Sequence, residues 1–315
     1  MKTDSSMVDR RGIPWTVAGV VFLVLVVFLM WQFRRETDPT RELAFKASRV
    51  DIVGRMELAL ASASEAEKSA VLAITDQDSQ TFADQARAAT AEVERERQEL
   101  GKLLATGGTK GEQDLFSRFS EAFADLRRID EEVLRLAVRN TNLKAFALAF
   151  GPAADTVTEL DTALSRVAAK RAAAPDAMQV LRLASDARIG LLHIHILLAP
   201  HIAEESDARM DQLEVSMAGE VTRVRKSLDG LAGLPSLKRD ADLAAAASAF
   251  VRYGDLKTRI LALSRENTNV RSMALSLNQK RKAMIVSLDA LNALRQAILD
   301  EPIAGVNYGR PPHPR

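Results

Sequence analysis

Cysteine is absent from the chain, and aromatic residues make up only 5% of it. The first absence excludes disulfide bonds, cysteine nucleophiles and thiolate-bound metal sites. It does not identify the compartment, because many exported bacterial proteins also lack cysteine. The scarcity of aromatic residues argues against sheets. Together with abundant Ala, Leu, Arg and Glu, it predicts an all-α protein with long helices.

The chain also lacks an excess of charge of either sign. It has 43 Lys and Arg against 42 Asp and Glu, a formal net charge of +1, and the two signs are interspersed. Such a distribution gives no basic surface for nucleic acid. A Gly-rich nucleotide loop, a pair of catalytic carboxylates and a Ser/His/Asp arrangement are likewise missing. We therefore expect no nucleic-acid partner, no cofactor and no enzymatic activity.

Long hydrophobic runs are missing too, with one exception near the start of the chain. Residues 13–33 carry no charge, and a helix of about 21 residues would span roughly 30 Å, enough to cross a bilayer once. Trp15 and Trp31 bracket this run as anchors at the two membrane interfaces. A cleaved signal peptide is the alternative, but no small-residue cleavage pattern follows Met30. We predict one transmembrane helix over 13–33, preceded by a short tail at 1–12.

The segment Asn-Thr-Asn occurs twice, at 140–142 and at 267–269, a separation of 127 positions. Neighbouring residues match at the same offset: Leu134 with Leu261, Leu136 with Leu263, Ala147 with Ala274, and Leu148 with Leu275. We interpret this similarity as an internal duplication. The two helical repeats would cover 39–171 and 175–300.

Both copies place the first asparagine on an apolar helix stripe. The stripes repeat at steps of three and four, as heptads do. The stripe of the first copy comprises Leu115, Phe119, Ala122, Leu126, Ile129, Val133, Leu136, Asn140, Leu143, Ala147 and Phe150. That of the second copy comprises Ile260, Leu263, Asn267, Val270, Ala274, Leu277, Arg281, Met284, Leu288, Leu291, Arg295 and Ile298. We expect Asn140 and Asn267 to point inward and either fix helix register or line a small polar pocket. The last asparagine of each copy would point about 200° away, into solvent. The threonine between them would bond a local carbonyl.

Six helical stretches follow the membrane segment. They are predicted over about 38–75, 80–105, 112 to a kink or end at Gly151-Pro152, 176–198, a stretch that follows the polar break at 204–206 and ends between 230 and 235, and 236–300, with 301–315 as a disordered tail. The last stretch would be one helix of roughly 60 residues, or about 90 Å. Short turns predict antiparallel neighbours. We expect an elongated up-and-down bundle of two duplicated units, with two bundles side by side as the alternative.

Four arginines are candidates to face other helices and bind a carboxylate: Arg281 and Arg295 on the stripe, and Arg182 and Arg188 on the fourth helix. Ordinary salt bridges are the competing interpretation. The candidate ligand-binding residues are thus Asn140, Asn267, Arg182, Arg188 and Arg281. His193, His195 and His201 do not predict a metal site, because side chains two apart on a helix diverge and no carboxylate completes the set.

A membrane helix that runs into antiparallel helices with polar breaks resembles the four-helix-bundle sensor domain of methyl-accepting chemotaxis receptors and sensor kinases. The duplicated plan is similar to the bimodular form, in which two bundles stack. The resemblance covers residues 10–300 and rests on architecture and heptads. It implies an extracytoplasmic domain on a single-pass cytoplasmic membrane protein, a homodimer, and binding of a small organic acid or amino acid between helices.

One departure from that family decides the functional expectation. Such receptors return through a second membrane helix to a cytoplasmic signalling part, and nothing after Asp300 is apolar enough to span a bilayer. We therefore expect a membrane-anchored sensory module that signals through a protein partner. A membrane-tethered scaffolding rod for protein–protein interaction is the alternative.

Overall fold

The computed structural model describes residues 23, 24, 26–28 and 39–303. Every regular element in this part of the chain is a helix, which confirms the all-α prediction. None of the described helices has the length and apolarity needed to cross a bilayer. Most of the predicted membrane segment 13–33, including Trp15 and Trp31, lies outside the described residues, as do the tail 1–12 and residues 304–315.

The helices follow one another with short connections. In chain order they are α2 (Pro39–Leu72), α3 (Asp76–Gly107), α4 (Lys110–Ala137), α5 (Thr141–Leu148), the π-helical turn η1 (Ala149–Ala153), α6 (Ala154–Lys170), α7 (Ala177–Ala203), α8 (Asp207–Ala232), the 3-10 turn η2 (Pro235–Leu237), α9 (Ala241–Glu266), α10 (Thr268–Leu275), the π-helical turn η3 (Ser276–Lys280) and α11 (Arg281–Asp300).

Polar side chains set several helix starts. Thr75, Ser206 and Asp240 each accept a hydrogen bond from the backbone N–H three residues on, and Thr109 forms a reciprocal capping box with Glu112. Two predicted boundaries were therefore wrong. The polar stretch from 76 to 79 opens α3 instead of breaking the chain, and the last long stretch begins after the Asp240 cap rather than at 236.

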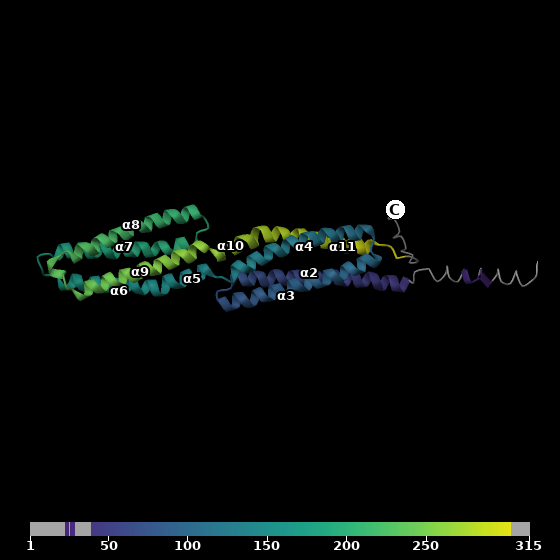
Figure 1. The fold of residues 1–315 in the computed structure, drawn as a ribbon, viewed down its shortest axis with the longest axis horizontal. Coiled ribbons are helices and arrows are strands. Elements are labelled where there is room, and N and C mark those ends of the chain that lie inside the picture. The colour runs from purple at the N-terminus through teal and green to yellow at the C-terminus, as the bar shows by residue number, and fades with distance from the viewer. Residues whose placement is uncertain (1–22, 25, 29–38, 304–315) are drawn as a thin grey trace, which may run out of the picture.

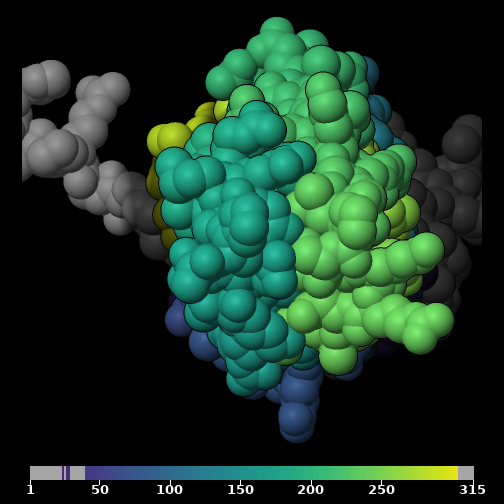
Figure 2. Space-filling model, turned by 90° about the vertical axis from the view of Figure 1, so that its left-hand side faces the viewer, coloured from purple at the N-terminus to yellow at the C-terminus, as the bar shows by residue number. Residues whose placement is uncertain are grey.

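The helices form two four-helix bundles stacked end to end as a rod (Figure 1). We call α2, α3, α4 and α11 the N-terminal bundle, and α6, α7, α8 and α9 the distal bundle. Neighbouring helices run up and down, as predicted. Each bundle takes three helices from one sequence repeat and the fourth from the other, because the chain crosses between bundles at α5 and returns at α10. The free end of the distal bundle is closed over, with no hollow along the axis (Figure 2).

Each bundle has its own apolar core. Leu160, Leu164, Leu191, Ile194 and Tyr253 are among the most buried side chains of the distal core. The core of the N-terminal bundle includes Ile52, Met56, Leu294 and the stacked pair Phe119 and Phe123, whose ring centroids are 5.6 Å apart. Full burial of such side chains contributes about 1.5–3 kcal/mol each. Two smaller apolar clusters, one of Ala70, Ala83, Ala86 and Leu134 and one of Val71, Val133 and Ala137, also lie in the N-terminal bundle. Each bundle is therefore held by apolar packing of its own.

Candidate functional site

Both long helices break where the two bundles meet. Asn140 (φ 50°, ψ 38°) and Asn267 (φ 52°, ψ 37°) adopt the left-handed conformation, and no other non-glycine residue in the described chain has a positive φ. Asparagine tolerates this conformation better than most residues, because its short polar side chain can bond locally. The prediction of one uninterrupted helix through each Asn-Thr-Asn was therefore wrong.

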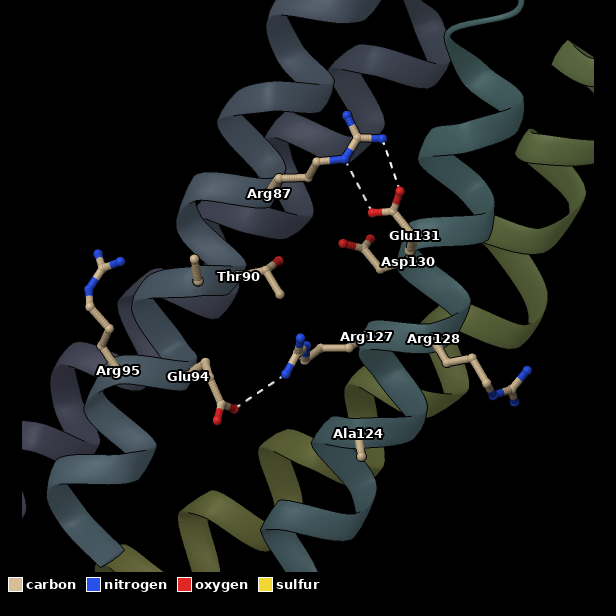
Figure 3. Close-up of a pocket in the computed structure, with 10 residues that line it drawn as sticks. Arg87, Thr90, Glu94, Arg95, Ala124, Arg127, Arg128, Asp130 and Glu131 are labelled. Atoms are coloured by element: carbon tan, nitrogen blue, oxygen red, sulfur yellow. Dashed lines mark hydrogen bonds and ion pairs between the residues drawn. The ribbon is translucent and has the colours of Figure 1, made fainter. Parts of the chain in front are cut away.

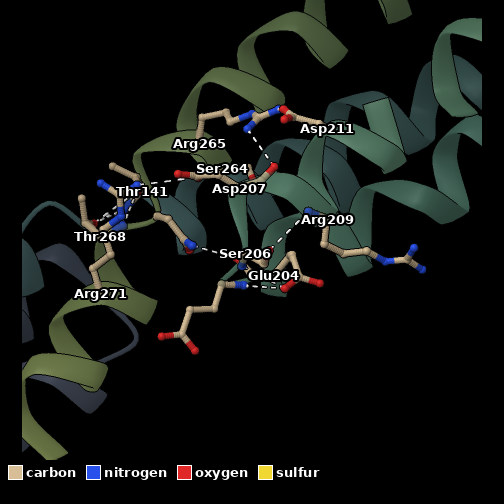
Figure 4. Close-up of polar contacts among 12 residues, drawn as sticks. Thr141, Glu204, Ser206, Asp207, Arg209, Asp211, Ser264, Arg265, Thr268 and Arg271 are labelled. Atoms are coloured by element: carbon tan, nitrogen blue, oxygen red, sulfur yellow. Dashed lines mark hydrogen bonds and ion pairs between the residues drawn. The ribbon is translucent and has the colours of Figure 1, made fainter. Parts of the chain in front are cut away.

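The two breaks cap one another's helices. The backbone N–H of Thr141 donates to Thr268 Oγ1 at 3.2 Å, and that of Thr268 donates to Thr141 Oγ1 at 3.1 Å. One residue on, the N–H of Asn142 donates to Asn269 Oδ1 at 3.2 Å, and that of Asn269 donates to Asn142 Oδ1 at 3.1 Å. Side chains of α10 thus accept hydrogen bonds from the free N–H groups that begin α5. Side chains of α5 do the same for the N–H groups that begin α10. We call this the Asn-Thr-Asn junction; Thr141 and Thr268 meet in Figure 4.

The amides of Asn140 and Asn267 are 1% exposed, which confirms that they point inward. Asn140 Nδ2 donates to Asp76 Oδ1 and Ser79 Oγ at 3.0 Å, and its Oδ1 accepts from Asn269 Nδ2 at 2.9 Å. Asn267 Nδ2 donates to the carbonyl of Glu204 at 2.7 Å, and its Oδ1 accepts from Asn142 Nδ2 at 2.7 Å. Because these groups are engaged within the protein, the geometry favours the register role over a ligand pocket.

Two details of the junction contradict the sequence-based expectation. Asn142, expected in solvent, is buried, and Asn269 is half-buried. The hydroxyls of Thr141 and Thr268 bond across the junction, 3.2 Å apart, instead of bonding a local carbonyl. Both differences arise from the left-handed asparagine, which turns the next two residues toward the opposite helix.

A polar shell surrounds the junction. Hydrogen bonding by Asn140, and then by Lys144, lowers the pKa of the Asp76 carboxyl. On the other side, Arg265 pairs with Glu214 at 2.7 Å. It also pairs with Asp211, which lies next to it in Figure 4. His201, fully buried, bridges Ser264 at 2.8 Å and Glu214 at 2.9 Å. These contacts tie α7, α8 and α9 to the crossing point.

The surroundings of His193 and His195 differ from those of His201. His193 is exposed and 3.5 Å from Glu220, whereas the ring of His195 lies against those of Phe150 and Tyr253, and burial lowers its pKa. In the part of the chain that the structure describes, no group of three His, Asp or Glu side chains is placed to hold a metal ion.

A π-helical turn follows each break at the same register, at 149–153 and at 276–280. Only the first contains proline, Pro152, so proline is not what produces the turn. Gly151-Pro152 also does not end its helix, because α6 continues directly from η1. A π turn adds one residue to a helical turn, which shifts the side chains that follow it by about 100°.

The prediction for Arg281 was wrong, because the buried positions after the break at Asn267 are Thr268, Ser272, Ser276 and Lys280, which lie off the predicted stripe. Arg281, expected on the inward stripe, is exposed, and Lys280 points inward in its place at 3% exposure. Lys280 Nζ donates to Glu67 Oε2 at 2.6 Å and lies 3.2 Å from Asp130 Oδ1. We call these three buried residues the charge triad. It holds two carboxylates and one ammonium, so it has a net charge of −1 when all are ionised. Desolvation is the largest cause that raises the pKa of Asp130.

The other predicted arginines are scattered. Arg182 is exposed, and Arg295 pairs with Glu57 at 2.9 Å. Arg188 lines a groove of about 450 Å³ between α6 and α7, where its Nε donates to Asp161 at 2.6 Å. Thus the structure brings Asn140 and Asn267 together at the junction, but none of the arginines joins them.

A larger groove, of about 610 Å³, lies between α3 and α4 and was missed from the sequence (Figure 3). Its lining carries four arginines (Arg87, Arg95, Arg127 and Arg128) and three acids (Glu94, Asp130 and Glu131), a net charge of +1. The signal available was Asp130 itself. It lies four residues after Leu126 and three before Val133, so steps of three and four reach it as well as they reach Ile129, which the predicted stripe used instead.

Comparison with known proteins does not assign this chain to a family. No protein-family model matches the chain, and no curated protein matches it.

Proposed function

We propose that this protein is a membrane-anchored sensory module of chemoreceptor type, which binds a small molecule and passes a conformational change to a partner protein. In this proposal the segment 13–33 crosses the cytoplasmic membrane once, and the rod lies on the periplasmic side as a homodimer. A small organic acid or amino acid is the ligand class that the resemblance implies.

The observation that carries the proposal is the helix exchange between the two bundles. The segment α4–α5–η1–α6 enters the distal bundle from the N-terminal bundle, and α9–α10–η3–α11 returns. Each bundle therefore contains part of both crossing segments. A shift of α6 in the distal bundle would reach α4 through the backbone of η1 and α5, and a shift of α9 would reach α11 through α10 and η3.

The Asn-Thr-Asn junction supports transmission by small shifts rather than by local melting. Its reciprocal hydrogen bonds hold α5 and α10 to one another, so the two crossing segments move together. Helix displacements of about 1–2 Å are a common form of switching in proteins. The π turns beside the junction are positions where a helix already departs from regular bonding.

A thermal-shift screen of the full chain in detergent against small acids and amino acids tests the proposal. A ligand that binds only the folded protein raises its melting temperature, by an amount set by RT ln(1 + [L]/Kd). The proposal expects at least one such ligand. No shift across a broad panel, together with a stable protein partner in a pull-down, would overturn it.

That second outcome would favour a scaffolding rod. The observation behind this alternative is the outward face of α7, where Met178, Leu181, Ile189, Leu192 and Ile196 are about half exposed or more. Exposed apolar side chains along one helix face are typical of protein–protein contacts. A scaffold would retain its protein partner whatever small molecules are present.

A further inference from the structure

We propose that the groove between α3 and α4 binds a small zwitterion of the α-amino acid class, with its ammonium on Asp130 and its carboxylate on Arg127. The inference rests on the proposed sensory function, and it assigns to that function a site and a ligand chemistry. Asp130, Thr90 and Arg127 face the gap between the two helices (Figure 3).

The anionic end of the site is a carboxylate short of donors. Asp130 is 5% exposed, and Lys280 Nζ, 3.2 Å from its Oδ1, is shared with Glu67 at 2.6 Å. Two buried carboxylates thus share one ammonium, and a buried carboxylate with too few donors is unfavourable. A ligand ammonium would bring three N–H donors and the positive charge that the charge triad lacks. Thr90, across the groove on α3, offers a hydroxyl beside it.

The cationic end is the one arginine of the groove that points into it with donors to spare. Arg127 reaches Glu94 only at 3.5 Å, and Glu94 is already held by two bonds from Arg97, at 2.7 and 3.0 Å. Arg87 is occupied by a two-point pair with Glu131, at 3.1 and 3.2 Å. Arg95 and Arg128 point away from the gap (Figure 3). A guanidinium with free N–H groups binds a carboxylate in a two-point geometry.

The spacing suits a compact zwitterion. Arg127 and Asp130 are three residues apart on α4, so their Cβ atoms lie about 5–6 Å apart on one helix face. The opposite charges of an α-amino acid are carried on one carbon and its neighbour, and the flexible Arg127 side chain can close the remaining distance. Ala91 and Ala124 keep the rest of the groove open, and its volume of about 610 Å³ leaves space for a ligand side chain.

Binding at this site would reach the crossing segment. Asp130 belongs both to the groove and to the charge triad, whose Lys280 ends η3 and leads into α11. A ligand ammonium on Asp130 would compete with Lys280 for the same carboxylate and leave Lys280 to Glu67 alone, at 2.6 Å. The site is thus connected to the helix that runs from the distal bundle.

The test is calorimetric titration of the full chain in detergent with the common α-amino acids. For the tightest binder, the amine without its carboxylate and the acid without its ammonium are titrated as well. We expect both to bind at least tenfold more weakly. Asp130→Asn and Arg127→Gln should each weaken the amino acid at least tenfold. Arg118→Gln, which alters an exposed arginine of α4 outside the groove, should change its affinity by less than twofold.

Arg127 is half exposed, so Arg127→Gln keeps the test valid if Asp130→Asn unfolds the protein. An acid that binds as tightly as the amino acid overturns the inference, as does an amino acid whose affinity is unchanged in Arg127→Gln. In those cases the sensory function stands with a different ligand or site. The absence of any small-molecule ligand overturns both proposals.

Discussion

The asparagines at 140 and 267 each serve two purposes at once. Their left-handed backbone ends one helix, and their buried amides join that end both to a neighbouring helix of the same bundle and to the other crossing segment. Glycine could supply only the first of these, and serine or aspartate at this site would supply only part of the amide's donor and acceptor set.

Substitutions at Asn140 separate the two contributions. Asn140→Ala should lower the free energy of unfolding by about 2–4 kcal/mol, because alanine loses the amide's bonds and is strained by about 1–2 kcal/mol in the left-handed region. Asn140→Gly should lose about 1 kcal/mol less, because only the bonds are lost. Urea unfolding measures both. Equal losses would show that backbone strain plays no part; Asn278→Ala, at an exposed amide, is the control, expected within about 0.5 kcal/mol.

Asp130 predicts an unusual pH dependence. Its folded-state pKa lies above the ordinary value of 3.8, so the folded chain holds this proton more tightly than the unfolded chain does. The contribution of Asp130 to stability therefore falls as pH rises above about 3.8 and stays low at neutral pH. Each unit of pKa elevation corresponds to about 1.4 kcal/mol.

Asp130→Asn, which leaves Lys280 paired with Glu67 alone, should thus melt above the wild type at pH 7 in the absence of ligand. The difference should shrink as pH falls toward 4, where Asp130 becomes protonated. Melting curves at a series of pH values check this. A variant that melts lower at pH 7 would show that the ion pair with Lys280 outweighs the desolvation of Asp130.

The spacing of apolar residues predicted the inward face of the long helices only in part. Steps of three and four correctly placed Asn140, Asn267, Leu291 and Ile298 inside. The same steps failed between the break at Asn267 and α11, where Thr268, Ser272, Ser276 and Lys280 are buried in place of Val270, Ala274, Leu277 and Arg281. No residue type at the π turns marks this change of register, since η1 contains Gly151-Pro152 and η3 contains Asn278-Gln279 at the matching positions. Lys280 was missed for this reason.

A proline substitution distinguishes a π turn from an ordinary helix interior. Gln279→Pro matches Pro152 in the other repeat, so we expect a loss of less than about 1 kcal/mol. Asp289→Pro, in the regular and equally exposed interior of α11, should cost about 3 kcal/mol or more, because it removes a hydrogen bond and clashes with the preceding turn. Urea unfolding of the two variants provides the comparison. Similar losses would mean that η3 has no special tolerance.

The internal duplication predicted two helical units but not their exchange of helices. Sequence similarity marks which segments correspond, whereas the exchange depends on the two crossing segments running past one another at the Asn-Thr-Asn junction, each from one bundle into the other. There the two left-handed asparagines are bonded to the opposite segment through Asn269 and Asn142. Neither copy alone contains this information, because each caps the helix of the other.

The shared segments predict cooperative unfolding of the rod. Ile194→Ala removes a fully buried side chain from the distal core and should cost about 2–5 kcal/mol. If the two bundles unfold together, amide exchange in α2 and α3 of the N-terminal bundle should accelerate by the same free energy as exchange in α7. Hydrogen exchange of the full chain measures this. Unchanged protection of α2 and α3 would show that the bundles unfold separately.

Helix α2 begins and helix α11 ends at the same end of the rod (Figure 1). There Lys46 Nζ donates to the carbonyls of Leu299 and Glu301, and buried Arg49 pairs with Glu112 at 2.8 Å and Glu301 at 2.7 Å. A pulling force applied between the two chain ends would load these contacts first, in a peeling geometry. The distal bundle, about half the rod away, would feel no tension until this clasp had opened.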